Sequence, residues 1–210
     1  MTALQASEDA RRTVPEPPVS YEEFLEWADE NTRAEWVDGQ IQVMSPASDK
    51  HQDLVRFLTS LFSTVAEESG GEALVRPAPF QMRLEDRPSG REPDVLVVTT
   101  PHGDRVRETH LEGPADLVVE IVSPKSGPRD RGEKFYEYEA AGIPEYWIVD
   151  PDREQLEVYR LERGQYRGVF MGADGRVESE VLEGLWIRAE WLWRAPLPRL
   201  LEVLSELDLV

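Results

Sequence analysis

Apolar residues recur along the chain in three patterns, and each pattern predicts a different kind of element. Helical spacing over 48–68 predicts a long helix with one buried face. Alternation of apolar and polar residues over 33–44 and 156–171 predicts two β-hairpins. Nearly unbroken Val, Ile and Leu over 95–98 and 117–122 is typical of strands covered on both faces. The chain therefore combines helices with a sheet that has a buried centre.

Turn and capping residues predict where several elements begin and end. Ser20 and Glu23 have the spacing of a capping box, which predicts a helix up to about residue 29. Asp38-Gly39 suits a type I′ hairpin turn, because both turn positions need positive φ. We also expect strands at 74–77, 80–84, 177–181 and 185–187, helices at 130–141 and 196–207, a charged loop at 85–91 and a polar connection at 99–114 that is long enough to cover a site.

The length and the even composition predict one domain. The chain has 210 residues, which is enough for a single sizeable core, and no shift of composition marks a second one. We expect residues 20–210 to form this domain and residues 1–19 to be a flexible polar lead-in. The order strand, loop, helix, strand over 116–151 places the domain in the α/β class.

Composition excludes several kinds of function. There are no cysteines, which rules out disulfides, thiolate metal sites and cysteine nucleophiles. No segment has the apolar length of a membrane span, and the N-terminus lacks the apolar core of a signal peptide, so we expect a cytoplasmic protein without membrane partners. The net charge of -19 argues against a broadly basic nucleic-acid-binding face.

A local basic face remains compatible with this overall charge. Two groups of basic residues near the buried strands would form either such a face or an ordinary solvated loop surface: Arg87, Arg91, Arg105 and Arg107, then Lys125, Arg129, Arg131 and Lys134.

Two acids in or beside the buried strands are the main candidates for chemistry. Glu120 interrupts an apolar strand, and Asp94 precedes the strand at 95–98. A buried carboxylate is costly unless it is paired, hydrogen-bonded or bound to a cation. With Lys134 on the next helix, the two acids could hold a divalent cation and a phosphate. Otherwise Asp94 would only begin a strand, Glu120 would pair with an arginine, and Lys134 would be a solvated helix residue.

The same residues belong to a wider set of motifs that resembles the Uma-two family of restriction endonucleases, within the PD-(D/E)XK nuclease superfamily. The matching segments are EWVDGQI at 35–41, MSP at 44–46, HQ at 51–52, PDV at 93–95, DLVVEIVSP at 116–124, Asp130-Arg131 with Lys134, and GIPEYWIVDP at 142–151. The resemblance implies a restriction-endonuclease-like fold, with a central mixed sheet flanked by helices and additional N-terminal and C-terminal hairpins.

The resemblance also implies a function and further site residues. It implies Mg²⁺- or Mn²⁺-dependent hydrolysis of DNA by a homodimer, with Asp94 and Glu120 as metal ligands and Glu35 as a third acid. The superfamily's lysine position, two residues after the second acid, holds Val122 here. Lys134 matches a lysine relocated to the following helix, and Lys125 on the intervening loop is the alternative.

Two questions stay open at this point. His51 and Gln52, at a helix N-terminus, would contact phosphate or a metal-bound water, or would only cap the helix. The missing lysine and the strong acidity also fit a domain that kept the nuclease fold but lost turnover and binds nucleic acid or protein. A scaffold held together by ion pairs is a third interpretation.

Overall fold

The structure, a computed structural model, describes residues 13–28, 32–85, 88–124 and 126–209. Within these residues the strands form a six-stranded, a five-stranded and a two-stranded sheet. Most of the expected lead-in at 1–19, together with Arg87 and Lys125, lies outside the described residues.

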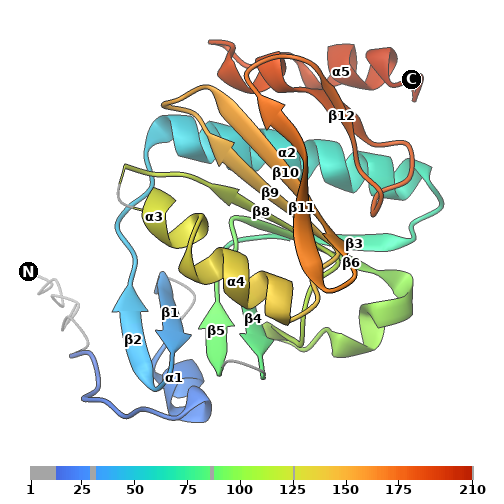
Figure 1. The fold of residues 1–210 in the computed structure, drawn as a ribbon. Coiled ribbons are helices and arrows are strands. Elements are labelled where there is room, and N and C mark those ends of the chain that lie inside the picture. The colour runs from blue at the N-terminus through green and yellow to red at the C-terminus, as the bar shows by residue number, and fades with distance from the viewer. Residues whose placement is uncertain (1–12, 29–31, 86–87, 125, 210) are drawn as a thin grey trace, which may run out of the picture.

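The six-stranded sheet is mixed and has the order β11-β10-β9-β8-β6-β3 (Figure 1). Strands β8 and β9 are parallel, and the other neighbours are antiparallel. The crossover between β8 and β9 contains two short helices, α3 and α4. The strands are β3 (Ala73–Pro77), β6 (Val95–Thr99), β8 (Leu117–Ile121), β9 (Glu145–Asp150), β10 (Gln155–Glu162) and β11 (Gln165–Gly172).

The five-stranded sheet contains the N-terminal hairpin and has the order β2-β1-β5-β4-β7. Its strands are β1 (Ala34–Val37), β2 (Gln40–Val43), β4 (Gln81–Leu84), β5 (Ser89–Arg91) and β7 (His110–Glu112). Asp38 and Gly39, between β1 and β2, both have positive φ, as the expected turn requires.

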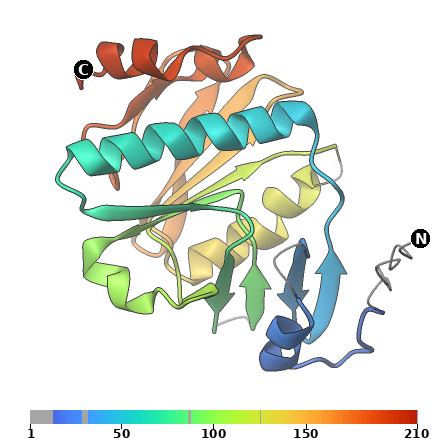
Figure 2. The same ribbon diagram turned by 180° about the vertical axis from the view of Figure 1, so that it is seen from behind.

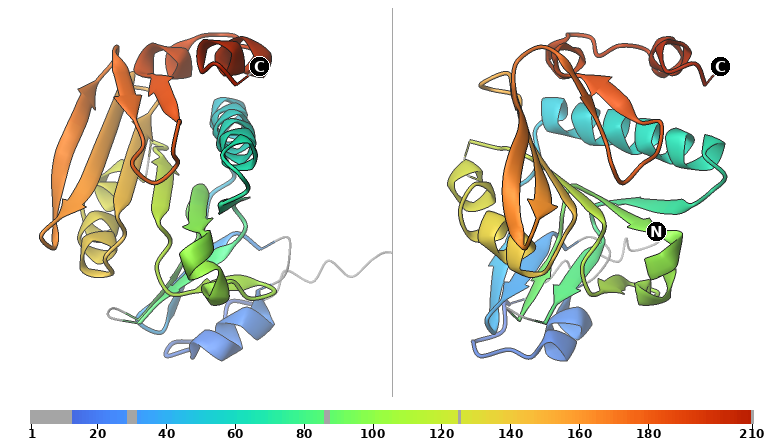
Figure 3. Two further views of the ribbon diagram at one scale, coloured as in Figure 1. Left: turned by 90° about the vertical axis from the view of Figure 1, so that its right-hand side faces the viewer. Right: turned by 45° about the vertical axis from the view of Figure 1, so that its right-hand side comes forward.

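Helices cover both faces of the six-stranded sheet (Figures 2 and 3). Helix α2 and helix α5 lie over one face, and α4 lies over the other. The described helices are α1 (Tyr21–Trp27), α2 (Asp49–Glu68), α3 (Gly127–Asp130), α4 (Glu133–Ala140) and α5 (Leu200–Glu206), with the 3₁₀ segments η1 (Thr100–Arg105) and η2 (Ala189–Trp193). The side chain and backbone of Ser20 exchange hydrogen bonds with Glu23, so the predicted capping box of α1 is confirmed.

Several expected elements differ from the prediction. The helix expected at 130–141 is divided into α3 and α4 at Gly132, where a Cβ would lie 2.7 Å from the backbone oxygen of Pro128. The helix expected from 196 begins at Leu200, because Pro196 and Pro198 disfavour helical backbone in the residues before them. The loop expected at 85–91 ends in strand β5.

A further difference concerns 177–181 and 185–187, which do not extend the central sheet. They contribute strands β12 (Arg176–Glu178) and β13 (Trp186–Arg188) to a separate hairpin. Val177 and Ile187 are buried in the core on the α2 side of the six-stranded sheet. The hairpin therefore covers a face of the central sheet instead of its edge.

Strand β8 carries side chains into two different cores. Leu117, Val119 and Ile121 belong to the core beneath α2 and α5. Val118 belongs to the core beneath α4, and Glu120, two residues on, points to the same face because side chains alternate along a strand. The acid is therefore set between the sheet and α4, where Lys134 lies. No helix in the described parts of the chain is long and apolar enough to cross a membrane.

Candidate active site

Asp94 and Glu120 face one cavity at the ends of two neighbouring strands. Val95 of β6 pairs with Val119 of β8 in antiparallel register, so Asp94, just before Val95, lies beside Glu120, just after Val119. Both acids line a cavity with a volume of about 460 Å³. Their relative exposures of 6% and 4% show that little solvent reaches them. The cavity thus collects both acids that the sequence analysis selected.

Lys134 lies against Glu120 from the helix side. Its Nζ is 2.8 Å from Oε1 of Glu120 and 2.7 Å from Oε1 of Glu35, and the residue is 1% exposed. One turn later on α4, the hydroxyl of Tyr138 also donates to Oε1 of Glu120, at 2.8 Å. Because both donors use Oε1, Oε2 is left available on the cavity side. The pairing partner of Glu120 is thus a lysine, and not an arginine as the scaffold interpretation expected.

Glu35 lies behind Lys134. Its second oxygen, Oε2, accepts a 3.0 Å bond from Nη1 of Arg91, and Glu35 is not among the described residues that line the cavity. Arg91 is fully buried and also pairs with Glu133 at 2.6 Å and Glu137 at 2.5 Å, both on α4. Arg91 therefore does not contribute to the expected basic surface. Its buried side chain instead forms ion pairs that link β5 to β1 and α4.

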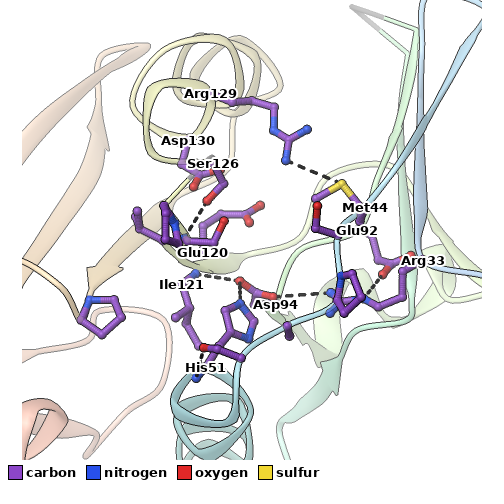
Figure 4. A pocket seen from close by; sticks show the side chains of 18 of the residues that line it. Arg33, Met44, His51, Glu92, Asp94, Glu120, Ile121, Ser126, Arg129 and Asp130 are labelled. Atoms are coloured by element: carbon purple, nitrogen blue, oxygen red, sulfur yellow. Dashed lines mark hydrogen bonds and ion pairs between the residues drawn. The ribbon is translucent and has the colours of Figure 1, made fainter.

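The carboxylate of Asp94 is held by neighbours on three sides (Figure 4). The backbone N–H of Ile121 donates to Oδ2 at 2.7 Å, and Nε2 of His51 is 3.2 Å from the same oxygen. Nη2 of Arg33 is 3.7 Å from Oδ1. His51, at the N-terminus of α2, thus lies in the cavity wall, whereas its neighbour Gln52 is exposed. The end of β8, helix α2 and the residue before β1 together fix the direction of the Asp94 carboxylate.

Asp130 is another acid of the cavity, and the sequence analysis did not place it in the site. It is the last residue of α3 and is 1% exposed, and it lines the cavity. Burial raises the pKa of its carboxyl group, against the opposing effect of Lys134. Its position four residues before Lys134 was the available signal, because residues at that spacing share a helix face.

Basic side chains line the outer part of the cavity. Arg33, Lys50 and Arg129 all contribute to its wall. Nζ of Lys50 donates to the backbone oxygen of Pro151 at 2.5 Å, and Nη1 of Arg129 donates to Oε1 of Gln42 at 3.3 Å. The cavity consequently has acids at its base and cations around them.

The other expected contributors lie elsewhere. None of residues 99–114 lines the cavity, although all of them are described, so the long polar connection does not cover it. Arg105 and Arg107 belong to that connection. Arg131 pairs with Asp150 and Glu157 instead. His102 pairs with Asp116 and His110 pairs with Glu112, both outside the cavity lining.

The buried charges shift one another's pKa values. Burial alone would raise the pKa of Glu35, but Lys134 and Arg91 outweigh it and lower this pKa to about 2. Burial would lower the pKa of Lys134, but Glu120 and Glu35 raise it above its ordinary range. For Glu120 burial dominates and raises the pKa, although Lys134 opposes the shift. Glu120 therefore depends on a nearby positive charge to stay ionised at neutral pH.

The donors of the cavity suit a hard divalent cation that keeps most of its waters. Among the described residues, no group of three or more His, Asp or Glu side chains is arranged to hold a metal ion directly. Mg²⁺ needs only one or two carboxylates, because water and substrate phosphate supply its other ligands. Asp94 and Glu120 provide those two carboxylates in one cavity.

Comparison with known proteins supplies the family. The model of the Uma2 (Uma-two) family, described as "Putative restriction endonuclease", matches residues 21–190. The chain belongs to this family. It is 29% identical over 185 residues to the uncharacterized protein slr1290 of Synechocystis sp., a match that covers 87% of this chain and 95% of that protein.

A solved structure supports the fold. The chain resembles the crystal structure of a "putative nuclease belonging to DUF820" from Anabaena variabilis, with a TM-score of 0.69 and 19% identity. The match covers 84% of this chain and 98% of the other. The expected restriction-endonuclease-like α/β fold of this Uma2 protein is confirmed.

We predict that Glu35→Gln makes the stability of the protein less dependent on acid pH. The ionised Glu35 stabilises the fold above its unfolded pKa of 4.5, and this contribution is lost as pH falls through about 2. The shift corresponds to about 3 kcal/mol. Unfolding by urea should show a gap between wild type and Glu35→Gln that is largest near neutral pH and shrinks between about pH 4.5 and pH 2.

The exposed Glu162 at the end of β10 provides a matched control. Glu162→Gln should change the free energy of unfolding by no more than about 0.5 kcal/mol. A gap between wild type and Glu35→Gln that stays constant with pH would show that the charge of Glu35 is not what stabilises the cluster.

Proposed function

We propose that this Uma2 protein is a metal-dependent endonuclease that hydrolyses phosphodiester bonds of DNA. One observation carries the proposal: Asp94 and Glu120 face the same cavity, and the buried amine of Lys134 lies 2.8 Å from Glu120. Two acids and a lysine at the end of a mixed sheet are the groups that phosphodiester hydrolysis needs for a cation and for a positioned water. The family description and the fold agree with this chemistry.

Each residue has a proposed role. Asp94 and Glu120 hold Mg²⁺ or Mn²⁺, with Oε2 of Glu120 on the cavity side. When bound, the cation would polarise the phosphoryl group and lower the pKa of water. Lys134 orients the attacking water or neutralises charge that develops on the phosphate. Glu35 assists by holding Lys134 through Oε1, and its place behind the lysine favours this role over the direct ligation that the resemblance implies.

The basic wall of the cavity is the proposed contact for the nucleic-acid backbone. Arg33, Lys50 and Arg129 lie where a phosphate would enter, in a chain whose net charge of -19 would otherwise repel DNA. Binding of this kind is restricted to the neighbourhood of the cavity. Because the salt dependence of binding scales with the number of phosphates contacted, the affinity should fall only moderately as the salt concentration rises.

A domain without turnover is the second candidate. Lys134 is shared between two buried acids, so the cluster is partly neutralised by the protein itself. Such a cluster would persist in a module that binds nucleic acid or protein and has lost catalysis. The two candidates differ in their need for a cation, because only the nuclease requires one between Asp94 and Glu120.

We predict that Glu120→Gln abolishes Mg²⁺-dependent cleavage of closed circular DNA while the fold is kept. The amide preserves the size of the side chain and an oxygen for Tyr138, but it removes the negative charge that the cation needs. The rate should fall by at least about 100-fold, measured from the conversion of supercoiled to nicked or linear plasmid. Cleavage by wild type should also stop when a chelator removes the cation.

Glu157→Gln is the matched control for the DNA assay. Glu157 is also buried and ion-paired, with Arg131, but it lies on β10 outside the cavity. This variant should cleave DNA at the wild-type rate. Full activity of Glu120→Gln, with a melting temperature that shows it to be folded, would disprove the assigned mechanism.

We further propose that the protein acts in the cytoplasm as a homodimer. One cavity can cut one strand at a time, and two related cavities would allow both strands of a duplex to be cut. Light scattering on purified protein should then give twice the mass of one chain. A particle of one chain mass at the concentration used for cleavage would contradict the dimer and leave the hydrolytic site unaffected.

A further inference from the structure

The carboxylate of Asp130 lines the cavity, and the proposed mechanism does not use it. Asp130 is 1% exposed, and neither of its oxygens has a hydrogen-bond partner of normal geometry among the described residues. Its side chain enters the cavity from α3, next to Ser126 and above Glu120 (Figure 4). Burial of a polar group without a partner costs free energy, and a bound ligand that supplies a hydrogen bond or a positive charge would offset that cost.

The nearby basic side chains do not provide that partner. Nζ of Lys134 bonds to Glu35 and Glu120. Nη1 of Arg129 donates to Gln42, and Nη2 lies 3.6 Å from the sulfur of Met44. The basic groups on either side of Asp130 are thus directed elsewhere. Burial raises the pKa of Asp130, and Lys134, the hydroxyl of Ser126 and Arg129 only partly oppose this effect. A positive charge or a hydrogen-bond donor from outside the chain would therefore stabilise the ionised carboxylate further.

We propose that Asp130 is a third acidic residue of the cation site and accepts hydrogen bonds from water molecules bound to the cation. Two facts indicate that Asp130 contacts the cation through water and does not ligate it directly. No three acidic or histidine side chains among the described residues are arranged to ligate a metal directly. Mg²⁺ also keeps several of its waters in protein sites, and those waters donate hydrogen bonds to carboxylates. The inference rests on the proposed function, because it assumes a cation between Asp94 and Glu120.

This role gives Asp130 effects of opposite sign with and without the cation. Without it, Asp130→Asn removes an unpaired buried charge and should raise the melting temperature. With it, the variant loses the acceptor for metal-bound water, and substitution of such partners typically weakens metal affinity about 10- to 100-fold. A residue that only joined α3 to α4 would lower the melting temperature on substitution and leave the affinity unchanged.

The test is calorimetric titration of the full-length protein with MnCl₂, together with melting temperatures measured in a chelator. Asp130→Asn should bind Mn²⁺ about 10- to 100-fold more weakly than wild type and should melt at a higher temperature. Asp152→Asn is the matched control, because Asp152 lines the outer cavity but is exposed. It should bind Mn²⁺ with the wild-type affinity, since exposed charges are screened by solvent.

The outcomes separate this inference from the proposed function. If wild type binds Mn²⁺ and Glu120→Gln does not, while Asp130→Asn binds as tightly as wild type, the role of Asp130 is disproved and the nuclease proposal stands. If wild type binds no Mn²⁺ at millimolar concentration, both are disproved. If Asp130→Asn does not fold, Asp130→Ser also removes the carboxylate and has a smaller side chain. Its Mn²⁺ affinity and melting temperature are then compared with those of wild type.

Discussion

The ammonium group of Lys134, placed between Glu35 and Glu120, is the interaction on which the site depends. Glu35 belongs to the five-stranded sheet, Glu120 to the six-stranded sheet and Lys134 to α4, so one buried cation joins three elements. Removing the lysine from this cluster would leave two buried acids without their shared cation, which is strongly destabilising. The geometry of the cavity is therefore tied to the integrity of the fold.

Arg91 adds further ion pairs to this cluster, outside the cavity lining. It has no exposed surface and pairs with Glu35, Glu133 and Glu137, so ion pairs hold the first two turns of α4 against β5. The charge of Glu35 is thereby shared between Arg91 and Lys134. Lys134 in turn is directed at Glu120, on the cavity side of the helix. The cluster orders the lysine before any substrate or cation arrives, which is the preorganisation that catalytic groups require.

Local patterns in the sequence predict much of this fold. Ser20 and Glu23 predict the start of α1, Asp38-Gly39 predicts the first hairpin, and the apolar run around Glu120 predicts the buried strand β8. The same run singles out Glu120, since an isolated acid in such a strand needs a partner. These features depend on neighbouring residues, which is why periodicity and turn chemistry suffice to find them.

Contacts between distant segments were beyond such patterns. Arg91 pairs with residues 42 to 56 positions away, and in the sequence it has the appearance of one basic residue in a charged loop. Asp130 is buried at the end of α3, just before the break at Gly132, where the backbone of Pro128 leaves no room for a side chain. Lys134 was selected as the lysine on the helix that follows Glu120, but its bonds to two acids depend on how α4 packs across both sheets.

The most direct test of the account is a crystal structure of the protein soaked in Mn²⁺, with anomalous diffraction used to locate the ion. The account predicts one strong anomalous peak in the cavity, between the carboxylates of Asp94 and Glu120, with Lys134 still bonded to Oε1 of Glu120. Anomalous peaks only at surface acids, with the space between Asp94 and Glu120 empty, would contradict it.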